Sequence, residues 1–133
     1  MFFRIFAIAC AVILCPQIGQ AQNAARELQN IYAIQGTVDF FAERGGAKWG
    51  LEVQSKSGDR RSCSTCHGAD LTQAGQHIKT KKHIEPMAFS VNKERYIKTK
   101  KIEKWFKRNC KWTWGRECTA QEKGDFLEYL LAQ

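Results

Sequence analysis

The sequence predicts an all-α domain built from a few short helices and much irregular chain. Apolar residues recur at helical spacing in several segments, whereas no segment alternates between apolar and polar residues as a half-buried strand does. The chain has 133 residues, 44% of them hydrophobic and 26% charged, which suits one ordinary globular domain. This composition excludes wholesale disorder, a collagen-like fibre and a multi-pass membrane protein.

Residues 1–21 have the layout of a secretory signal peptide. Arg4 supplies a positive charge, an apolar run follows in residues 5–14, and small residues flank Gln20 in the triplet 19–21. The apolar run is too short to span a bilayer. The sequence therefore predicts cleavage after Ala21 and export of one domain, residues 22–133, into a bacterial periplasm, with no membrane span left after cleavage.

The first helix is expected over residues 24–34. Asp39 can cap a second short helix that runs to about Arg44, where Gly45-Gly46 would stop it. Residues 69–87 show little periodicity and are expected to be irregular.

The C-terminal third has the clearest helical signals. A helix is predicted over residues 99–109, followed by a short loop, residues 110–118. Thr119-Ala120-Gln121-Glu122 is a capping box that opens the last helix. Three or four short helices bury little apolar area, so a large flat apolar cofactor is expected to fill the centre.

Four of the six cysteines remain after cleavage of the signal peptide: Cys63, Cys66, Cys110 and Cys118. Free thiols do not persist in an oxidising compartment, so each of the four should be bonded to something.

Cys63-Ser64-Thr65-Cys66-His67 is the attachment motif of c-type haem. One helical turn lets two sulfurs reach one side of a porphyrin while the following histidine meets the iron. A zinc site that adds His77 and His83 is a weaker alternative, because the spacer is short for a zinc finger. A thiol redox centre is the other alternative, but it would need a parallel-sheet context that this sequence lacks.

With His67 as the proximal iron ligand, the sixth ligand decides the function. A strong thioether or imidazole ligand makes an electron carrier, whereas a weakly filled position lets small molecules bind. The candidates are Met87, His77, His83 and Asn109. Met87 is the conventional choice, and also suits a gap-filling role in the core. The two histidines lie among lysines and are expected to be exposed.

Asn109 ends an apolar stripe. Ile102, Trp105, Phe106 and Asn109 follow the i, i+3, i+4, i+7 pattern of one helix face. The amide either caps the end of the helix or points at the iron.

Residues 92–131 resemble the sphaeroides haem protein family, which is an oxygen-binding monohaem cytochrome c. The resemblance is carried by K-I-E-K-W-F-K-R-N-C at 101–110 and G-R-E-C-T at 115–119, and by C-S-T-C-H-G-A-D at 63–70. It extends over about residues 40–131. The basic residues at the start of the helix and the pair Trp112 and Trp114 depart from the family pattern.

This resemblance implies a small class I-like cytochrome c fold, wrapped around one covalent haem c attached through Cys63 and Cys66. It implies that Asn109 is the distal ligand of ferric iron and leaves on reduction, so that oxygen or nitric oxide binds. It also implies a Cys110–Cys118 disulfide and a small dihaem cytochrome c as redox partner. A plain electron-transfer cytochrome that uses Met87 is the alternative.

The net charge is +8, and twelve Lys or Arg lie between residues 79 and 111 against three Glu. This basic region either steers an acidic redox partner or is a solubilising surface. Nucleic acid is not expected as a partner of an exported haem protein. No general acid or base stands out, which favours electron transfer and ligand binding over enzymatic turnover.

Overall fold

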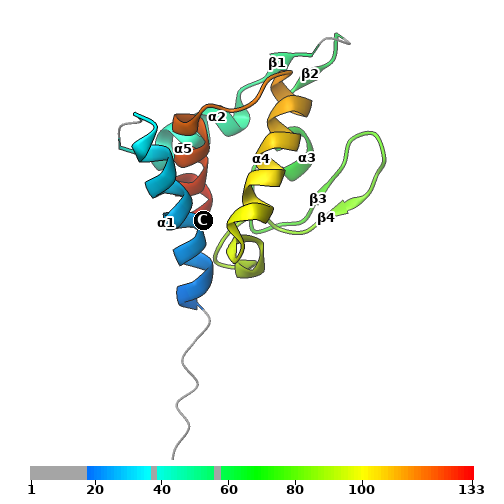
Figure 1. Ribbon diagram of the computed structural model, residues 1–133. Coiled ribbons are helices and arrows are strands. Elements are labelled where there is room, and N and C mark those ends of the chain that lie inside the picture. Colours follow the sequence, from blue (N-terminus) through cyan, green and yellow to red (C-terminus); the bar gives the residue numbers. More distant parts are fainter. Residues whose placement is uncertain (1–17, 37–38, 56–57) are drawn as a thin grey trace, which may run out of the picture.

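The computed structural model describes residues 18–36, 39–55 and 58–133, which are mainly helical (Figure 1). The helices are α1 (Ile18–Ile34), α2 (Ala42–Gly50), α3 (Ser64–His67), the 3-10 helix η1 (Lys93–Tyr96), α4 (Thr99–Trp114) and α5 (Ala120–Leu131). There are also four strands of two residues each. β1 (Val53–Gln54) pairs with β2 (Arg60–Arg61), and β3 (Gly75–Gln76) pairs with β4 (His83–Ile84), both antiparallel. The predicted all-α class is confirmed, and strands of two residues are too short to produce an alternating pattern.

The predicted signal peptide lies mostly outside the described residues. α1 begins at Ile18, so it contains the triplet after which cleavage is predicted. Among the described helices, none is long and apolar enough to cross a membrane.

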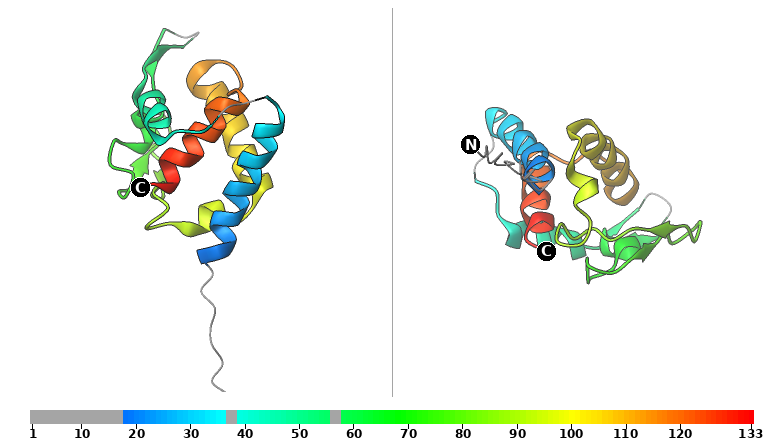
Figure 2. Two further views of the ribbon diagram at one scale, coloured as in Figure 1. Left: turned by 90° about the vertical axis from the view of Figure 1, so that its left-hand side faces the viewer. Right: turned by 90° about the horizontal axis from the view of Figure 1, so that it is seen from below.

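α5 is the helix against which α1 and α2 pack. It contacts both α1 and α2, while α4 contacts α1 and η1. Figures 1 and 2 show α1 and α5 side by side, with α4 and the β3–β4 hairpin on the other side of the molecule. The core between them contains Tyr32, Leu71, Ile102, Phe126, Leu127 and Leu130.

α2 differs from its prediction at both ends. Asp39 is not the N-cap; the cap residue is Phe41, whose backbone N–H donates to the Asp125 carboxylate of α5 (2.9 Å). Gly45-Gly46 does not end the helix. Gly45 lies where α2 crosses α5, and a Cβ there would overlap the Asp125 carbonyl. The glycine pair therefore allows two helices to approach closely, a tertiary role that local propensity cannot reveal.

The buried Asp125 carboxylate anchors the start of α2. Arg44 donates to both of its oxygens, from Nε (2.9 Å) and from a terminal nitrogen (2.8 Å). Burial alone would raise the pKa of Asp125, but these hydrogen bonds hold that pKa below its usual value. The pair therefore ties α2 to α5 as charged groups.

α4 is longer than predicted, because it runs through Cys110 to Trp114. No helix breaker precedes Gly115, which adopts the left-handed conformation (φ 70°) and ends the helix. The loop between α4 and α5 is therefore residues 115–119, shorter than the predicted loop over residues 110–118. The predicted capping box of α5 is confirmed: the Glu122 N–H donates to Thr119 Oγ1 (3.2 Å), and the Thr119 N–H donates to the Glu122 carboxylate (2.9 Å).

Candidate haem site

The motif of residues 63–67 forms one helical turn, as predicted. The Cys63 carbonyl accepts from the N–H groups of Cys66 (3.3 Å) and His67 (3.2 Å). Ser62 and Thr65 cap the turn reciprocally, because each backbone N–H donates to the other's side-chain oxygen (2.9 and 3.2 Å). The turn thus places both thiols and the imidazole along one cavity.

The β3–β4 hairpin closes tightly on this turn. A Cβ at Gly75 would overlap the Cys66 carbonyl and approach His67 Cα to 2.9 Å. Only glycine allows this approach, so Gly75 fixes the position of the attachment turn relative to the hairpin.

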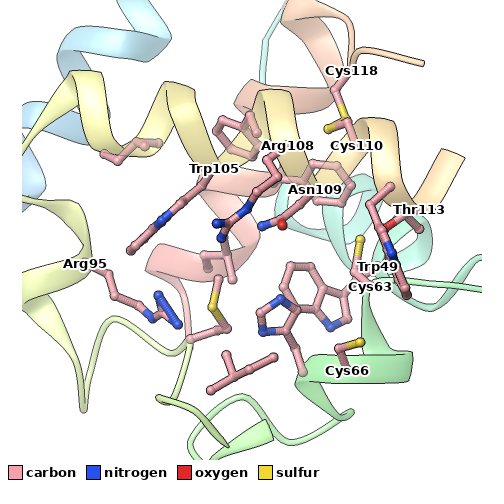
Figure 3. Close-up of a pocket in the computed structure, with 18 of the residues that line it drawn as sticks. Trp49, Cys63, Cys66, Arg95, Trp105, Arg108, Asn109, Cys110, Thr113 and Cys118 are labelled. Carbon is pink, nitrogen blue, oxygen red and sulfur yellow. A yellow bond between two sulfur atoms is a disulfide. The ribbon is translucent and has the colours of Figure 1, made fainter. Parts of the chain in front are cut away.

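The cavity beside the turn has a volume of about 470 Å³, which lies in the range of cofactor sites. Figure 3 shows it between the turn that carries Cys63 and Cys66 and helix α4. Its apolar and aromatic lining includes Ile84, Met87, Ile102, Trp105, Phe106, Trp114, Phe126, Leu127 and Leu130. The small helical core therefore encloses a large apolar space, as the sequence led us to expect.

His67 is a neutral, unpartnered imidazole at this cavity. Burial, and then the positive charge of Arg95, lower the pKa of His67 to about 4. Its Nδ1 is buried without a hydrogen-bond partner in the described part of the chain, and so is Trp114 Nε1. The imidazole lies against the Trp49 ring, with centroids 5.4 Å apart. An unpaired neutral imidazole above an apolar cavity is suited to bind iron.

The thiols do not have the properties of a thiol redox centre. Cys63 and Cys66 are not joined by a disulfide. Burial raises the pKa of Cys63 to about 12, whereas reactive cysteines need a lowered pKa. One half-buried and one buried thiol beside an unpaired imidazole fit covalent haem attachment instead.

The structure does not assemble the alternative zinc site. No three His, Cys, Asp or Glu side chains gather around one point in residues 18–36, 39–55 and 58–133. The His77 ring is tilted against the Trp112 ring, with centroids 5.6 Å apart, and its Nδ1 accepts from the backbone N–H groups of Lys79 and Thr80. His83 is exposed and pairs with Glu85 (3.1 Å). Although His77 lines the cavity, it is thus held by its own loop, and His83 lies outside the cavity.

Met87 and Asn109, the two main candidates for the sixth ligand, both line the cavity. Met87 is 9% exposed, and its backbone is fixed by hydrogen bonds with Leu71 and Tyr96. Asn109 lies on the last part of α4, half-buried, and Figure 3 shows its carboxamide pointing into the cavity. The carboxamide makes no hydrogen bond to any described residue.

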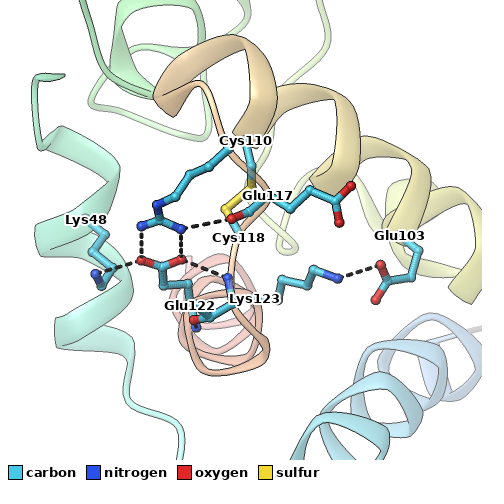
Figure 4. The surroundings of a disulfide bond; sticks show 9 residues. Lys48, Glu103, Cys110, Glu117, Cys118, Glu122 and Lys123 are labelled. Atoms are coloured by element: carbon cyan, nitrogen blue, oxygen red, sulfur yellow. Dashed lines mark hydrogen bonds and ion pairs between the residues drawn. A yellow bond between two sulfur atoms is a disulfide. The ribbon is translucent and has the colours of Figure 1, made fainter. Parts of the chain in front are cut away.

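Cys110 and Cys118 form a disulfide, with their Cα atoms 5.6 Å apart, which confirms the pairing implied by the family resemblance. Beside it, the buried Glu122 accepts two hydrogen bonds from Arg116 (2.7 and 2.8 Å) and one from Lys48 (3.1 Å) (Figure 4). Burial alone would raise the pKa of Glu122, but these partners lower it to about 2. The disulfide thus links Cys110, the residue after Asn109, to the start of α5, and the Lys48–Glu122 contact links α5 to α2.

Several residues that line the cavity were not predicted as site residues. Trp49 lies on the part of α2 beyond its predicted end, so no local pattern pointed to it. Arg95 and Arg108 counted only as members of the basic region, because a sequence does not show which charges face inward.

A small helical domain whose single Cys-X-X-Cys-His turn faces an apolar cavity has the fold and site of a c-type cytochrome. The cytochrome c-type protein SHP of Cereibacter sphaeroides is 39% identical over 96% of this chain and 98% of its own length. A family model described as a domain of unknown function (DUF1924) matches residues 35–130. The chain therefore belongs to the DUF1924 family, with the sphaeroides haem protein as a relative.

Two solved structures have the same fold. Oxidised SHP, described as an oxygen-binding cytochrome c, matches with a TM-score of 0.74 and 40% identity over 82% of this chain and 96% of its own. The solution structure of cytochrome c'' from Methylophilus methylotrophus, described as giving insight into haem-ligand detachment, matches with a TM-score of 0.72 and 27% identity over 88% and 96%. The chain is a small c-type cytochrome, and its cofactor is covalently bound haem c.

Proposed function

We propose that this chain is an exported periplasmic cytochrome with one haem, which binds a small diatomic ligand such as oxygen or nitric oxide at the iron. Cys63 and Cys66 hold the haem through thioether bonds, and His67 is the proximal ligand. Asn109 is the distal ligand of the oxidised state and leaves when the protein is reduced. The observation that carries the proposal is the unpaired Asn109 carboxamide, which points into the cavity from α4.

Haem supplies an iron that takes up one electron and offers a sixth coordination position. The choice of an amide for that position has a chemical consequence. An amide oxygen is a hard donor and binds ferric iron better than ferrous iron. Asn109 is therefore a ligand whose affinity falls on reduction, which frees the position for a diatomic molecule. The relatives support this proposal, since one is an oxygen-binding cytochrome c and the other concerns haem-ligand detachment.

The second candidate is a plain electron-transfer cytochrome in which Met87 is the sixth ligand. It is favoured by the burial of Met87 along the same cavity. A thioether sulfur is a soft donor that stays on ferrous iron. The two candidates thus predict opposite behaviour on reduction.

An absorption spectrum of the purified protein separates these candidates. We expect a Soret band from the haem, and a ferrous form that is high-spin and shifts on addition of carbon monoxide, because Asn109 has left. A sulfur-to-iron charge-transfer band in the red region of the ferric spectrum, with no response of the ferrous form to carbon monoxide, would assign Met87 and reject the ligand-binding proposal. A protein without a Soret band would reject both.

The basic region of residues 79–111 is proposed as the docking surface for an acidic redox partner, which the family resemblance suggests is a small dihaem cytochrome c. Nine of its lysines are exposed in the structure: Lys79, Lys81, Lys82, Lys98, Lys100, Lys101, Lys104, Lys107 and Lys111. Arg108, also exposed, lines the cavity, so this charge extends to the mouth of the site.

Reduction by an acidic cytochrome is expected to slow about tenfold or more as ionic strength rises from about 0.01 to 1 M, because the Debye length falls from about 30 to 3 Å. Stopped-flow mixing measures this rate. An uncharged small-molecule reductant serves as the control, and its rate should stay nearly constant. Equal salt dependence for both reductants would leave the basic region with a solubilising role only.

A further inference from the structure

Arg95 carries a partly buried positive charge that forms no ion pair with any described carboxylate. Its Nε donates to the Pro86 carbonyl (2.9 Å) and a terminal nitrogen donates to the Glu85 carbonyl (3.0 Å). The Glu85 carboxylate pairs with His83 instead (3.1 Å). No ion pair of Arg95 occurs in the part of the chain that the structure describes.

The guanidinium is held in place although its charge is not neutralised. It lies over the Trp105 ring, 4.6 Å from the centroid, and the two backbone carbonyls fix its edge. These contacts use two of the five N–H donors of a guanidinium. Burial lowers the pKa of Arg95 below its ordinary value, and the nearby Glu85 carboxylate offsets this effect only in part. A fixed, partly buried cation of this kind indicates an anion that is present in the working protein.

The position of Arg95 identifies the anion. Arg95 and Trp105 both line the cavity. In Figure 3 they lie on one side of it, while Cys63 and Cys66 lie on the opposite side. The two propionates of haem c are attached to the porphyrin edge opposite the two carbons that bond to cysteine sulfur. A haem attached to Cys63 and Cys66 therefore directs its propionates toward Arg95.

We propose that Arg95 is a positioning residue that pairs with a haem propionate, and that Trp105 holds its guanidinium flat against the cavity wall. This inference rests on the haem site in this cavity, but not on the identity of the sixth ligand. Planar guanidinium groups suit carboxylates because they donate two parallel hydrogen bonds. The pair neutralises both charges and fixes the free edge of the cofactor.

Besides His67, three other side chains that can carry a positive charge line the cavity: His77, Lys82 and Arg108. His77 is fixed by its own loop and by Trp112. Lys82 and Arg108 are exposed and lack the two carbonyl contacts that hold Arg95. Arg108 is the strongest competitor for the role, so its variant belongs in the test.

The test uses the haem-containing protein labelled with ¹³C in the propionate carboxylates. Ferrous-minus-ferric infrared difference spectra and reduction potentials are measured for R95Q, R95K and R108Q. K104Q is the matched control, since it removes one charge from an exposed position of α4 outside the cavity. The Soret band and carbon monoxide binding of each variant report separately on the haem and on the proposed function.

We expect R95Q to shift the propionate carboxylate bands and to lower the reduction potential, because an unpaired propionate stabilises ferric iron. R95K should keep most of the wild-type potential, and K104Q should match the wild type. Wild-type bands and potential in R95Q, or a band shift in R108Q alone, would overturn the proposal.

A measurement on the unaltered protein decides the question should R95Q fail to fold. In the low-spin ferrous protein, obtained with carbon monoxide or, if Met87 is the sixth ligand, without it, nuclear Overhauser contacts are expected between the guanidinium protons of Arg95 and the propionate methylenes. Contacts of those methylenes with Arg108 or Lys82 in place of Arg95 would reject the assignment.

Discussion

Asn109→Leu is expected to turn the oxidised protein from low-spin to high-spin, with the iron five-coordinate or bound to water. Leucine keeps the size and branching of the side chain but has no donor oxygen. The reduction potential should rise, because ferric iron loses more stabilisation than ferrous iron. Carbon monoxide binding to the ferrous form should barely change, since under our proposal Asn109 does not bind ferrous iron. Electron paramagnetic resonance, voltammetry and a carbon monoxide titration measure these three effects.

Met87→Leu is the matched control, because Met87 lines the same cavity and leucine differs little from it in volume. This variant should leave the ferric spin state unchanged and cost less than about 1.5 kcal/mol of stability. The opposite result, in which Met87→Leu becomes high-spin while Asn109→Leu stays low-spin, would identify an ordinary electron-carrying cytochrome.

Cys63→Ser combined with Cys66→Ser is expected to give a protein without covalent haem that folds poorly. Without the haem, the apolar lining of the cavity would be exposed to water instead of being covered by the cofactor. A small domain has only about 5–15 kcal/mol of stability with which to offset that loss. A pyridine haemochrome assay measures haem attachment, and circular dichroism during urea titration measures folding.

Ser64→Ala is the control for the double variant, since Ser64 lies in the same helical turn but has no sulfur. It should attach haem and unfold nearly as the unaltered protein does. Native-like helix content and stability in the double serine variant would show that the helices support themselves, and that the cofactor is not needed for folding.

Local chemistry made part of the fold predictable. The attachment turn follows from five consecutive residues, and the capping box of α5 from the spacing of Thr119 and Glu122. The family resemblance supplied the Cys110–Cys118 pair. The helical stripe placed Asn109 on the face of α4 that lines the cavity, which the structure confirms. Its role as iron ligand stays a prediction.

The features that were missed depend on contacts distant in sequence. Gly45-Gly46 indicated a helix end in isolation, but in the fold Gly45 meets the backbone of α5. The cap of α2 is provided by Asp125, 84 residues away along the chain. Arg95 is distinctive only because the fold surrounds it with carbonyls and an indole, while no described carboxylate forms an ion pair with it. Such arrangements have no signature in a local pattern.

The disulfide next to Asn109 determines how a distal ligand on α4 can move. Cys110 is bonded to Cys118 at the entrance of α5, and the Glu122 network holds α5 against α2. These links restrain sliding and unwinding of the helix backbone beside Asn109. If Asn109 is the distal ligand, as we propose, its carboxamide would leave the iron mainly by rotation about its two side-chain torsions. Rotations of exposed side chains take picoseconds to nanoseconds, whereas collective helix movements take microseconds to milliseconds. The movement of the side chain would then not limit how soon the binding position opens after the iron is reduced. The return of Asn109 would compete directly with an incoming diatomic molecule.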